Sequence, residues 1–170
     1  MSILDDEIGR PDDGFWDDGD WVSWDFINQQ IYLQERRETF PEAPPEIIDL
    51  FDTLVDIALE YREVTGRYLP LFGELGELYA EIRYGIRRHQ PGAAGSDGRL
   101  GNDFVEVKTI SPCKAVPKVF VKRGGHFSKL VVVKISERFE FDARMIDRKA
   151  LKKGKGRRAS VSWSSMPDGK

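Results

Sequence analysis

The chain has 170 residues, 40% of them hydrophobic and 32% charged, which is enough for one folded domain with a real core. It contains no apolar run of transmembrane length, its acidic start lacks the basic and apolar regions of a signal peptide, and its single cysteine, Cys113, excludes an internal disulfide. The sequence therefore predicts a cytoplasmic protein with no membrane contact.

The net charge of −3 conceals an asymmetry along the chain. Residues 1–60 contain 17 acidic and 3 basic residues, whereas residues 61–170 contain 12 acidic and 23 basic residues. The basic part suits a nucleic-acid partner, and the acidic part would either stay away from that partner or dock a basic protein. The alternative is that the two parts simply attract each other within the fold.

The sequence of the N-terminal third predicts an arm that is followed by two helices. Residues 1–20 read as an acidic arm, disordered over roughly the first dozen positions. The stretch "WVSWDFINQQIYLQERR" predicts a helix with Ser23 as its N-cap. After the break "FPEAPP", a second helix carries Pro45 in its first turn and ends near Gly66. Residues 21–66 would form an N-terminal helical layer.

A third helix is predicted from about residue 71, with three glutamates outside its apolar arc. Gly73, Gly76 and Ala80 form a narrow face beside Glu77 that lets the backbone approach another element closely. This arrangement favours Glu77 as an inward carboxylate. Glu74 and Glu81 remain alternatives for this role, and the other alternative is that they form an ordinary solvated acidic stripe. The apolar arc is formed by Leu71, Leu75, Leu78, Tyr79, Ile82 and Ile86, and the glutamates are Glu74, Glu77 and Glu81.

The stretch "GSDGRLGNDFVEVKTI" predicts a hairpin with Gly101-Asn102 as its two-residue loop. This register places Asp97 opposite Glu106, where two like charges would repel each other. Either solvent separates the two carboxylates, or a divalent cation such as Mg²⁺ lies between them. The remaining predicted pairs are Leu100 with Asp103, Arg99 with Phe104 and Gly98 with Val105.

Strand alternation after the turn sends Val105 and Val107 to one face and Glu106 and Lys108 to the other. The valines would enter a core, and the charged pair would share the face that Asp97 reaches. Two carboxylates and an ammonium on rigid strands can bind a cation, position a water molecule and stabilise a developing negative charge.

Asp97 followed by Glu106-Val107-Lys108 resembles the core motif of the PD-(D/E)XK nucleases, which have the restriction-endonuclease-like fold. The resemblance spans about residues 70–135 and includes an upstream helix that supplies a glutamate, here Glu77. It implies that Asp97, Glu106 and the main-chain carbonyl of Val107 hold Mg²⁺ or Mn²⁺. It also implies that Lys108 orients or helps to deprotonate the attacking water, and that Glu77 holds a second metal or an outer-shell water.

The chain departs from the family pattern in two places. Ser96, not proline, precedes Asp97, and the prolines and glycines of "SPCKAVPKVFVKRGGHFSKL" allow only a short helix around residues 126–130, where the family commonly places a helix. The strands "KVFVKR", "KLVVVKIS" and "RFEFDARMI" and a short helix starting at Asp147 complete a core over residues 67–151. Residues 152–170 read as a basic, then serine-rich tail.

Basic residues on both sides of the motif are candidates for phosphate contacts, which position a nucleic acid without reading its bases. For the arginines after the third helix, the alternative is pairing with the acidic stripe, and for the downstream lysines it is a solvated strand face. The predicted nucleic-acid contacts are Arg87, Arg88, Lys114, Lys122 and Arg123.

These elements together predict an α/β fold with a central mixed sheet of four to five strands flanked by helices, a restriction-endonuclease-like core and an N-terminal helical extension. The expected function is a Mg²⁺-dependent nuclease that hydrolyses phosphodiester bonds, with DNA as the expected substrate. The main alternative is an inactive nucleic-acid-binding or protein-interaction module on the same fold. A third reading has the acidic residues 1–60 docking a basic partner, and a homodimer is also compatible with the sequence.

Overall fold

The structure, a computed structural model, describes residues 13–93 and 95–168 and divides into two compact units, Met1–Pro41 and Glu42–Lys170. The predicted disorder of the first dozen residues lies outside the described part of the chain. The boundary between the units falls inside the predicted helical layer of residues 21–66. Its first helix therefore belongs to the first unit, and its second helix belongs to the unit that carries the sheet.

The first unit contains a hairpin, strands β1 (Gly14–Asp17) and β2 (Asp20–Ser23), followed by helix α1 (Trp24–Thr39). Most of this hairpin lies in the predicted acidic arm, for which no strand was expected. Asp18 and Gly19 form its turn with φ values of 50° and 95°, which is the left-handed conformation that a tight Asp-Gly hairpin requires. The Ser23 side chain accepts a hydrogen bond from the Phe26 N–H at 3.2 Å, which confirms the predicted N-cap.

The second unit is built on a five-stranded mixed sheet in the order β3-β4-β5-β7-β8, in which only the β5–β7 pair is parallel. Two further strands, β6 and β9, pair antiparallel with each other and form a separate ribbon. The predicted mixed sheet of four to five strands is confirmed. The elements of this unit are α2 (Pro45–Thr65), α3 (Phe72–Tyr84), β3 (Arg87–Arg88), β4 (Gly98–Leu100), β5 (Asp103–Ile110), β6 (Lys118–Lys122), β7 (Lys129–Ile135), β8 (Phe141–Asp147), the 3₁₀ helix η2 (Arg148–Ala150), β9 (Arg158–Ser162) and the 3₁₀ helix η3 (Trp163–Ser165).

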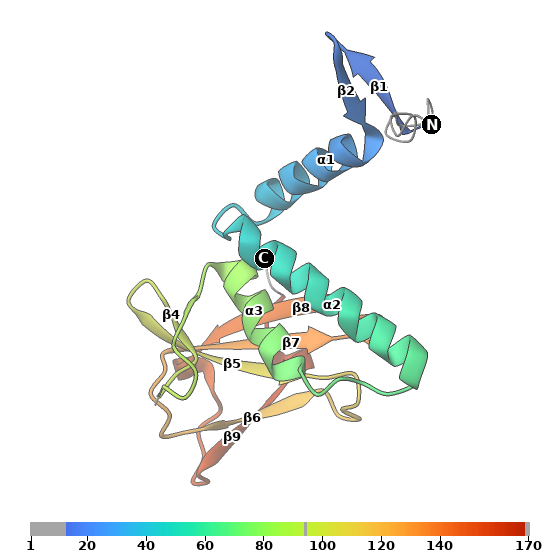
Figure 1. Ribbon diagram of the computed structural model, residues 1–170. Coiled ribbons are helices and arrows are strands. Elements are labelled where there is room, and N and C mark those ends of the chain that lie inside the picture. Colours follow the sequence, from blue (N-terminus) through green and yellow to red (C-terminus); the bar gives the residue numbers. More distant parts are fainter. Residues whose placement is uncertain (1–12, 94, 169–170) are drawn as a thin grey trace. The chain divides into compact units, whose positions relative to one another are not determined.

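Three layers make up this unit: helices α2 and α3 cover one face of the sheet, and the β6–β9 ribbon covers the other (Figure 1). The prediction that helices flank the sheet is therefore correct for one face only. The short helix predicted around residues 126–130 does not form. Part of the predicted tail becomes β9 and pairs with β6. Apolar side chains fill the space on the ribbon side, namely Ile110, Val119, Val121, Phe127, Leu130, Val132, Ala159, Val161, Trp163 and Met166.

Both helices of this layer end on glycines in the left-handed conformation. The end of α2 at Gly66 is as predicted, whereas α3 ends before Ile86, which the predicted apolar arc included. Gly66 closes α2 with φ 68° and Gly85 closes α3 with φ 67°.

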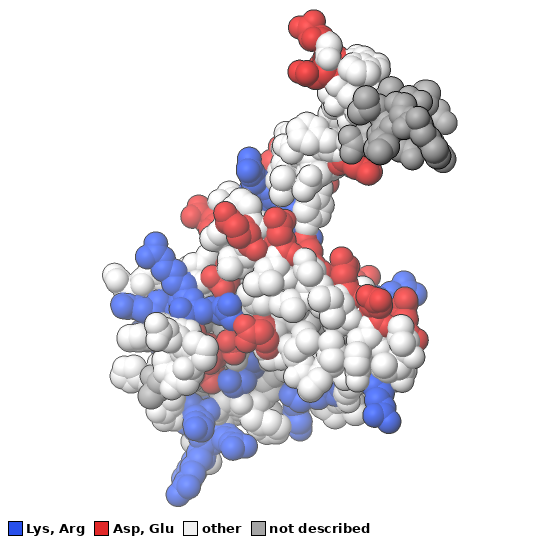
Figure 2. Space-filling model, in the orientation of Figure 1, with Lys and Arg blue, Asp and Glu red and all other residues white. Residues whose placement is uncertain are grey.

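Acidic side chains run along α2, whereas basic side chains gather where β6 and β9 lie (Figure 2). Burial, and then the neighbouring Asp56, raise the pKa of Asp52 on α2 to about 6. Within the described residues, no helix is both long enough and apolar enough to cross a membrane.

Helix α3 lies close to β5 because Gly76 has no side chain. A Cβ atom at this position would lie 2.0 Å from Thr109 Oγ1 and within 3.2 Å of its Cβ and Cγ2, so rotation of the threonine would not relieve the overlap. We expect Gly76→Ala to lower the free energy of unfolding by about 1–3 kcal/mol, the usual cost of overpacking. Urea titration would measure this change in the free energy of unfolding. Gly73→Ala is the matched control, since Gly73 is in the same helix with open space around it. Equal stabilities for the two variants would contradict the close approach.

Candidate active site

The Gly101-Asn102 hairpin forms with the predicted register: Leu100 pairs with Asp103, Arg99 with Phe104 and Gly98 with Val105. The pairing stops there. The Asp97 N–H donates to the Val105 carbonyl at 3.0 Å, although Gly98 is already the ladder partner of Val105. Asp97 is therefore one residue out of register, and the predicted direct opposition of Asp97 and Glu106 is wrong.

The Asp97 carboxylate turns instead onto the β5 backbone. Its Oδ2 accepts a hydrogen bond from the Val107 N–H at 2.6 Å, and its main-chain carbonyl accepts from the His89 N–H at 2.9 Å. The preceding Ser96 is buried, with its carbonyl 3.1 Å from His89 Nδ1. These contacts fix Asp97 directly before β4.

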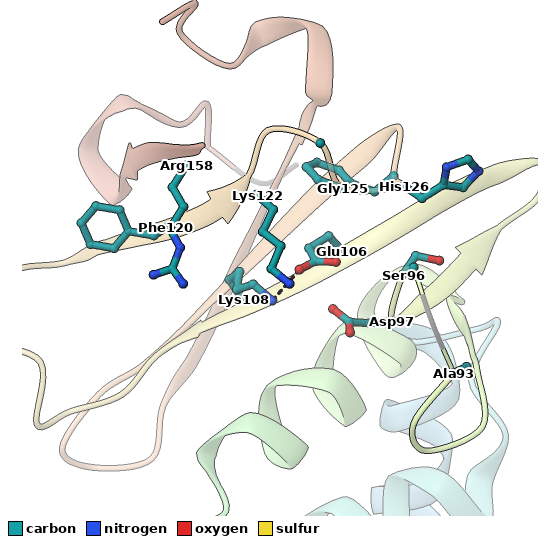
Figure 3. Close-up of a pocket in the computed structure, with 13 residues that line it drawn as sticks. Ala93, Ser96, Asp97, Glu106, Lys108, Phe120, Lys122, Gly125, His126 and Arg158 are labelled. Atoms are coloured by element: carbon teal, nitrogen blue, oxygen red, sulfur yellow. Dashed lines mark ion pairs between the residues drawn. The ribbon is translucent and has the colours of Figure 1, made fainter. Parts of the chain in front are cut away.

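Glu106 and Lys108 share the β5 face opposite to Val105 and Val107, as the alternation predicts: both valines are buried and both charged residues are half-buried. The Lys108 ammonium lies 2.7 Å from Glu106 Oε1 and donates to the Val107 carbonyl oxygen at 3.1 Å. Figure 3 shows this ion pair with Asp97 beside it. One ammonium thus contacts two of the oxygens that the family resemblance assigns to a cation.

Glu77 approaches this group from helix α3. Burial raises the pKa of its carboxyl above the ordinary value, and the negative charges of Asp97 and Glu74 raise it further, against the opposing effect of Arg88 and Lys108. A carboxylate that is partly buried beside another carboxylate is stabilised by a cation. The structure therefore brings Glu77 into the electrostatic environment of Asp97.

The other two helix glutamates are tied to one arginine. Arg88 Nη1 donates to Glu74 at 2.6 Å and its Nε donates to Glu81 at 2.7 Å. Burial alone would lower the pKa of the guanidinium, but the two glutamates together outweigh it and raise the pKa. Glu77 is thus the glutamate of this helix that lies toward Asp97, and Arg88 takes the alternative role of pairing with the acidic stripe.

The four predicted catalytic residues lie where three surface hollows adjoin. Of these four residues, Asp97, Glu106 and Lys108 line the first hollow. Asp97 and Glu77 line the second, and Glu77 and Lys108 line the third. The four side chains therefore all border open space at the surface.

The remaining predicted nucleic-acid contacts differ in their surroundings. Lys122 lines the first hollow with Glu106, and Arg87 is exposed and lines the second. Lys114 is exposed in a loop and lines none of these three hollows. Arg123 donates from Nη1 to the Lys152 carbonyl, so it holds the chain that leads into β9.

Two residues that line the first hollow with Glu106 and Lys108 were not predicted as site residues: Phe120 and Arg158. The alternation of "KVFVK" gives a signal for Phe120, because it puts that ring on the same strand face as Lys122. Arg158 lies in a segment that the sequence analysis assigned to the tail.

The oxygens at this site suit a hard cation. No three His, Cys, Asp or Glu side chains come together as a ready-made metal site in residues 13–93 and 95–168. Asp97, Glu106 and the Val107 carbonyl instead offer two carboxylates and one neutral oxygen, a set that fits Mg²⁺ because this ion usually keeps several waters. The contact of the Lys108 ammonium with two of these oxygens is consistent with a position that attracts positive charge.

We expect Glu77→Gln to impair any catalysis more than Glu74→Gln or Glu81→Gln, because the charge of Asp97 acts on Glu77, whereas Glu74 and Glu81 are ion-paired with Arg88. Stability provides a second readout. A raised pKa means that the folded state binds the proton more tightly than the unfolded state, so the ionised carboxylate destabilises the metal-free fold.

Metal-free Glu77→Gln should therefore be more stable than wild type at neutral pH. This advantage should fade as the pH falls through the raised pKa toward the ordinary value of 4.5 and below. Urea unfolding in EDTA across this range measures the difference. An advantage that grows on acidification would contradict the assignment.

Comparison with known proteins adds no assignment: neither the models of known protein families nor the curated proteins contain a match to this chain.

Proposed function

We propose that this chain is a nuclease that depends on Mg²⁺ or Mn²⁺ and hydrolyses phosphodiester bonds in nucleic acid, with DNA as the expected substrate. The observation that carries the proposal is the position of the Lys108 ammonium, in contact with both Glu106 Oε1 and the Val107 carbonyl and beside Asp97. A lysine that can hold these oxygens without metal can turn to a water molecule when a cation takes them.

In this proposal, Asp97, Glu106 and the Val107 carbonyl hold the cation, and Glu77 holds a second metal or an outer-shell water. The bound cation would supply charge for a phosphate oxygen and lower the pKa of a bound water. Lys108 would orient the attacking water or accept its proton, and the hydrogen bond from the Val107 N–H would keep Asp97 in place.

The topology around the site supports a restriction-endonuclease-like core. An acid precedes β4, the Glu-Val-Lys triplet lies on the adjacent strand β5, and an upstream helix supplies a glutamate on the other side. The β6–β9 ribbon occupies the place after the triplet where a helix is expected, and we propose it as a local replacement. The cytoplasm is the compartment that we propose, since the thiol of Cys113 is free and exposed.

The second candidate is a binding module on the same fold, without catalysis. The ion pair of Lys108 with Glu106 favours it, because a permanent pair would neutralise the site and leave only the basic surface active. A partner for the acidic residues 1–60 is compatible with both candidates.

A cleavage assay separates the two candidates. The purified chain would be incubated with single-stranded and duplex DNA and RNA in Mg²⁺, in Mn²⁺ and in EDTA, next to Glu106→Gln purified identically to control for contaminating nucleases. The proposal expects cleavage with metal by wild type alone. If all DNA and RNA substrates stay intact with both metals, the nuclease proposal is wrong and the binding module is the remaining candidate.

A further inference from the structure

The outward face of the β6–β9 ribbon carries an unusual row of side chains. Lys118, Phe120 and Lys122 alternate with the buried Val119 and Val121, so they point away from the core. Their cross-strand partners on β9 are Ser162, Ser160 and Arg158, in that order. This face therefore presents one aromatic ring among cations and small hydroxyl side chains.

The Phe120 ring is open to solvent. Its side chain is 48% exposed, its directly opposed neighbour is the small Ser160, and the Lys118 ammonium lies 5.4 Å from the ring centroid. One exposed phenylalanine is unremarkable by itself. Phe120, however, lines the same hollow as Glu106 and Lys108, and these two charged residues are the centre of the proposed site (Figure 3).

Next to the ring, Lys122 and Arg158 oppose each other directly across the ribbon. Like charges at such a pair destabilise the ladder unless an anion lies between them. Within the described part of the chain, neither side chain forms an ion pair, whereas Arg88, Lys129 and Arg144 all do. Both side chains extend from the ribbon toward the space over β5, where the sheet carries Glu106 and Lys108 (Figure 3).

We propose that this ribbon face binds single-stranded nucleic acid: Phe120 stacks on an unpaired base, and Lys122 and Arg158 hold the neighbouring phosphate. Aromatic rings combined with a basic groove bind single strands because every base has a face that can stack. A base inside a duplex has both faces covered, so it would have to unpair before it reached Phe120.

The consequence of this binding rests on the proposed function: an unpaired strand held by the ribbon would be presented to Glu106 and Lys108. The proposal names the substrate class of the site as a strand with unpaired bases, and it assigns Phe120 and Arg158 as binding residues.

The test is a titration in EDTA, with fluorescence anisotropy of labelled oligothymidine as a single strand and of the same strand annealed to oligoadenine. We expect the single strand to bind more tightly than the duplex. Phe120→Ala and Phe120→Leu should each weaken single-strand binding by about 5- to 100-fold, which corresponds to one stacked base, and Phe120→Trp should retain it. Phe26→Ala, at another exposed phenylalanine, is the matched control and should bind like wild type.

The phosphate contacts have their own readout. Lys122→Gln and Arg158→Gln should each reduce the slope of log affinity against log salt by about 0.7 for the single strand, whereas the exposed Arg67→Gln should not. The proposal is overturned if the duplex binds more tightly, or if Phe120→Ala leaves single-strand binding unchanged.

These titrations contain no free metal, so their outcome is independent of hydrolysis. A chain that shows the Phe120-dependent binding but never cleaves would overturn the nuclease proposal and support the ribbon assignment. A chain that cleaves, while Phe120→Ala binds like wild type, would overturn the ribbon assignment alone.

Discussion

Replacement of Lys108 by methionine should slow hydrolysis by about 10²-fold or more, the range typical of a positioned proton-transfer group, while metal and nucleic-acid binding stay close to wild type. Methionine keeps most of the length of the side chain and removes the ammonium that contacts Glu106 and the Val107 carbonyl. In the metal-free protein this ammonium offsets the negative charge of Glu106. In the proposed mechanism a bound cation would take over that role, and Lys108 would be needed only for the chemical step.

Binding and single-turnover cleavage would therefore be measured on the same preparation of Lys108→Met, with the exposed Lys149→Met as the matched loss of one lysine charge. A parallel loss of binding and cleavage would reassign Lys108 to phosphate binding. Full cleavage by Lys108→Met would remove the basis for the nuclease proposal, because the triplet would then be a coincidence of strand alternation.

Two substitutions of Asp97 should have the same effect on cleavage and different effects on stability. Asp97→Ala removes the acceptor of the Val107 N–H, and an unsatisfied buried donor costs about 1–3 kcal/mol of folding free energy. Asp97→Asn keeps an oxygen acceptor and removes a charge that acts on Glu77, so its stability should match or exceed wild type. Both variants lose the carboxylate proposed to hold the cation, so both should lose cleavage.

Chemical denaturation in EDTA and cleavage assays in Mg²⁺ together measure this pair. Equal stability of Asp97→Ala and Asp97→Asn would show that the Val107 hydrogen bond contributes little to the fold. Cleavage by Asp97→Asn at the wild-type rate would remove Asp97 from the proposed metal ligands.

Local signals in the sequence predict much of this fold. The Gly-Asn turn sets the β4–β5 register, alternation on β5 separates Val105 and Val107 from Glu106 and Lys108, and Gly66 marks the end of α2. Each of these features depends on residues within a few positions of one another. The Asp-Gly turn of the β1–β2 hairpin is an equally local signal that the sequence analysis passed over.

Features that depend on distant contacts could not be predicted in the same way. The β6–β9 ribbon joins strands more than thirty residues apart, and no local pattern in the tail identifies Lys122 as the partner of Arg158. The departure of Asp97 from the hairpin register depends on contacts with His89 and Val107. Arg88 has two glutamate partners on a helix that precedes it, so its role depended on how α3 packs.

The central claim, that a cation can take the oxygens now contacted by Lys108, is tested most directly by a crystal structure with Mn²⁺ and anomalous scattering. The account predicts an anomalous peak bound by Asp97, Glu106 and the Val107 carbonyl, with the Lys108 ammonium displaced from Glu106. The matched crystal of Glu106→Gln should show a weaker peak or none. A fully ordered Lys108–Glu106 ion pair in wild-type crystals, with no peak beside Asp97 at saturating Mn²⁺, would contradict it.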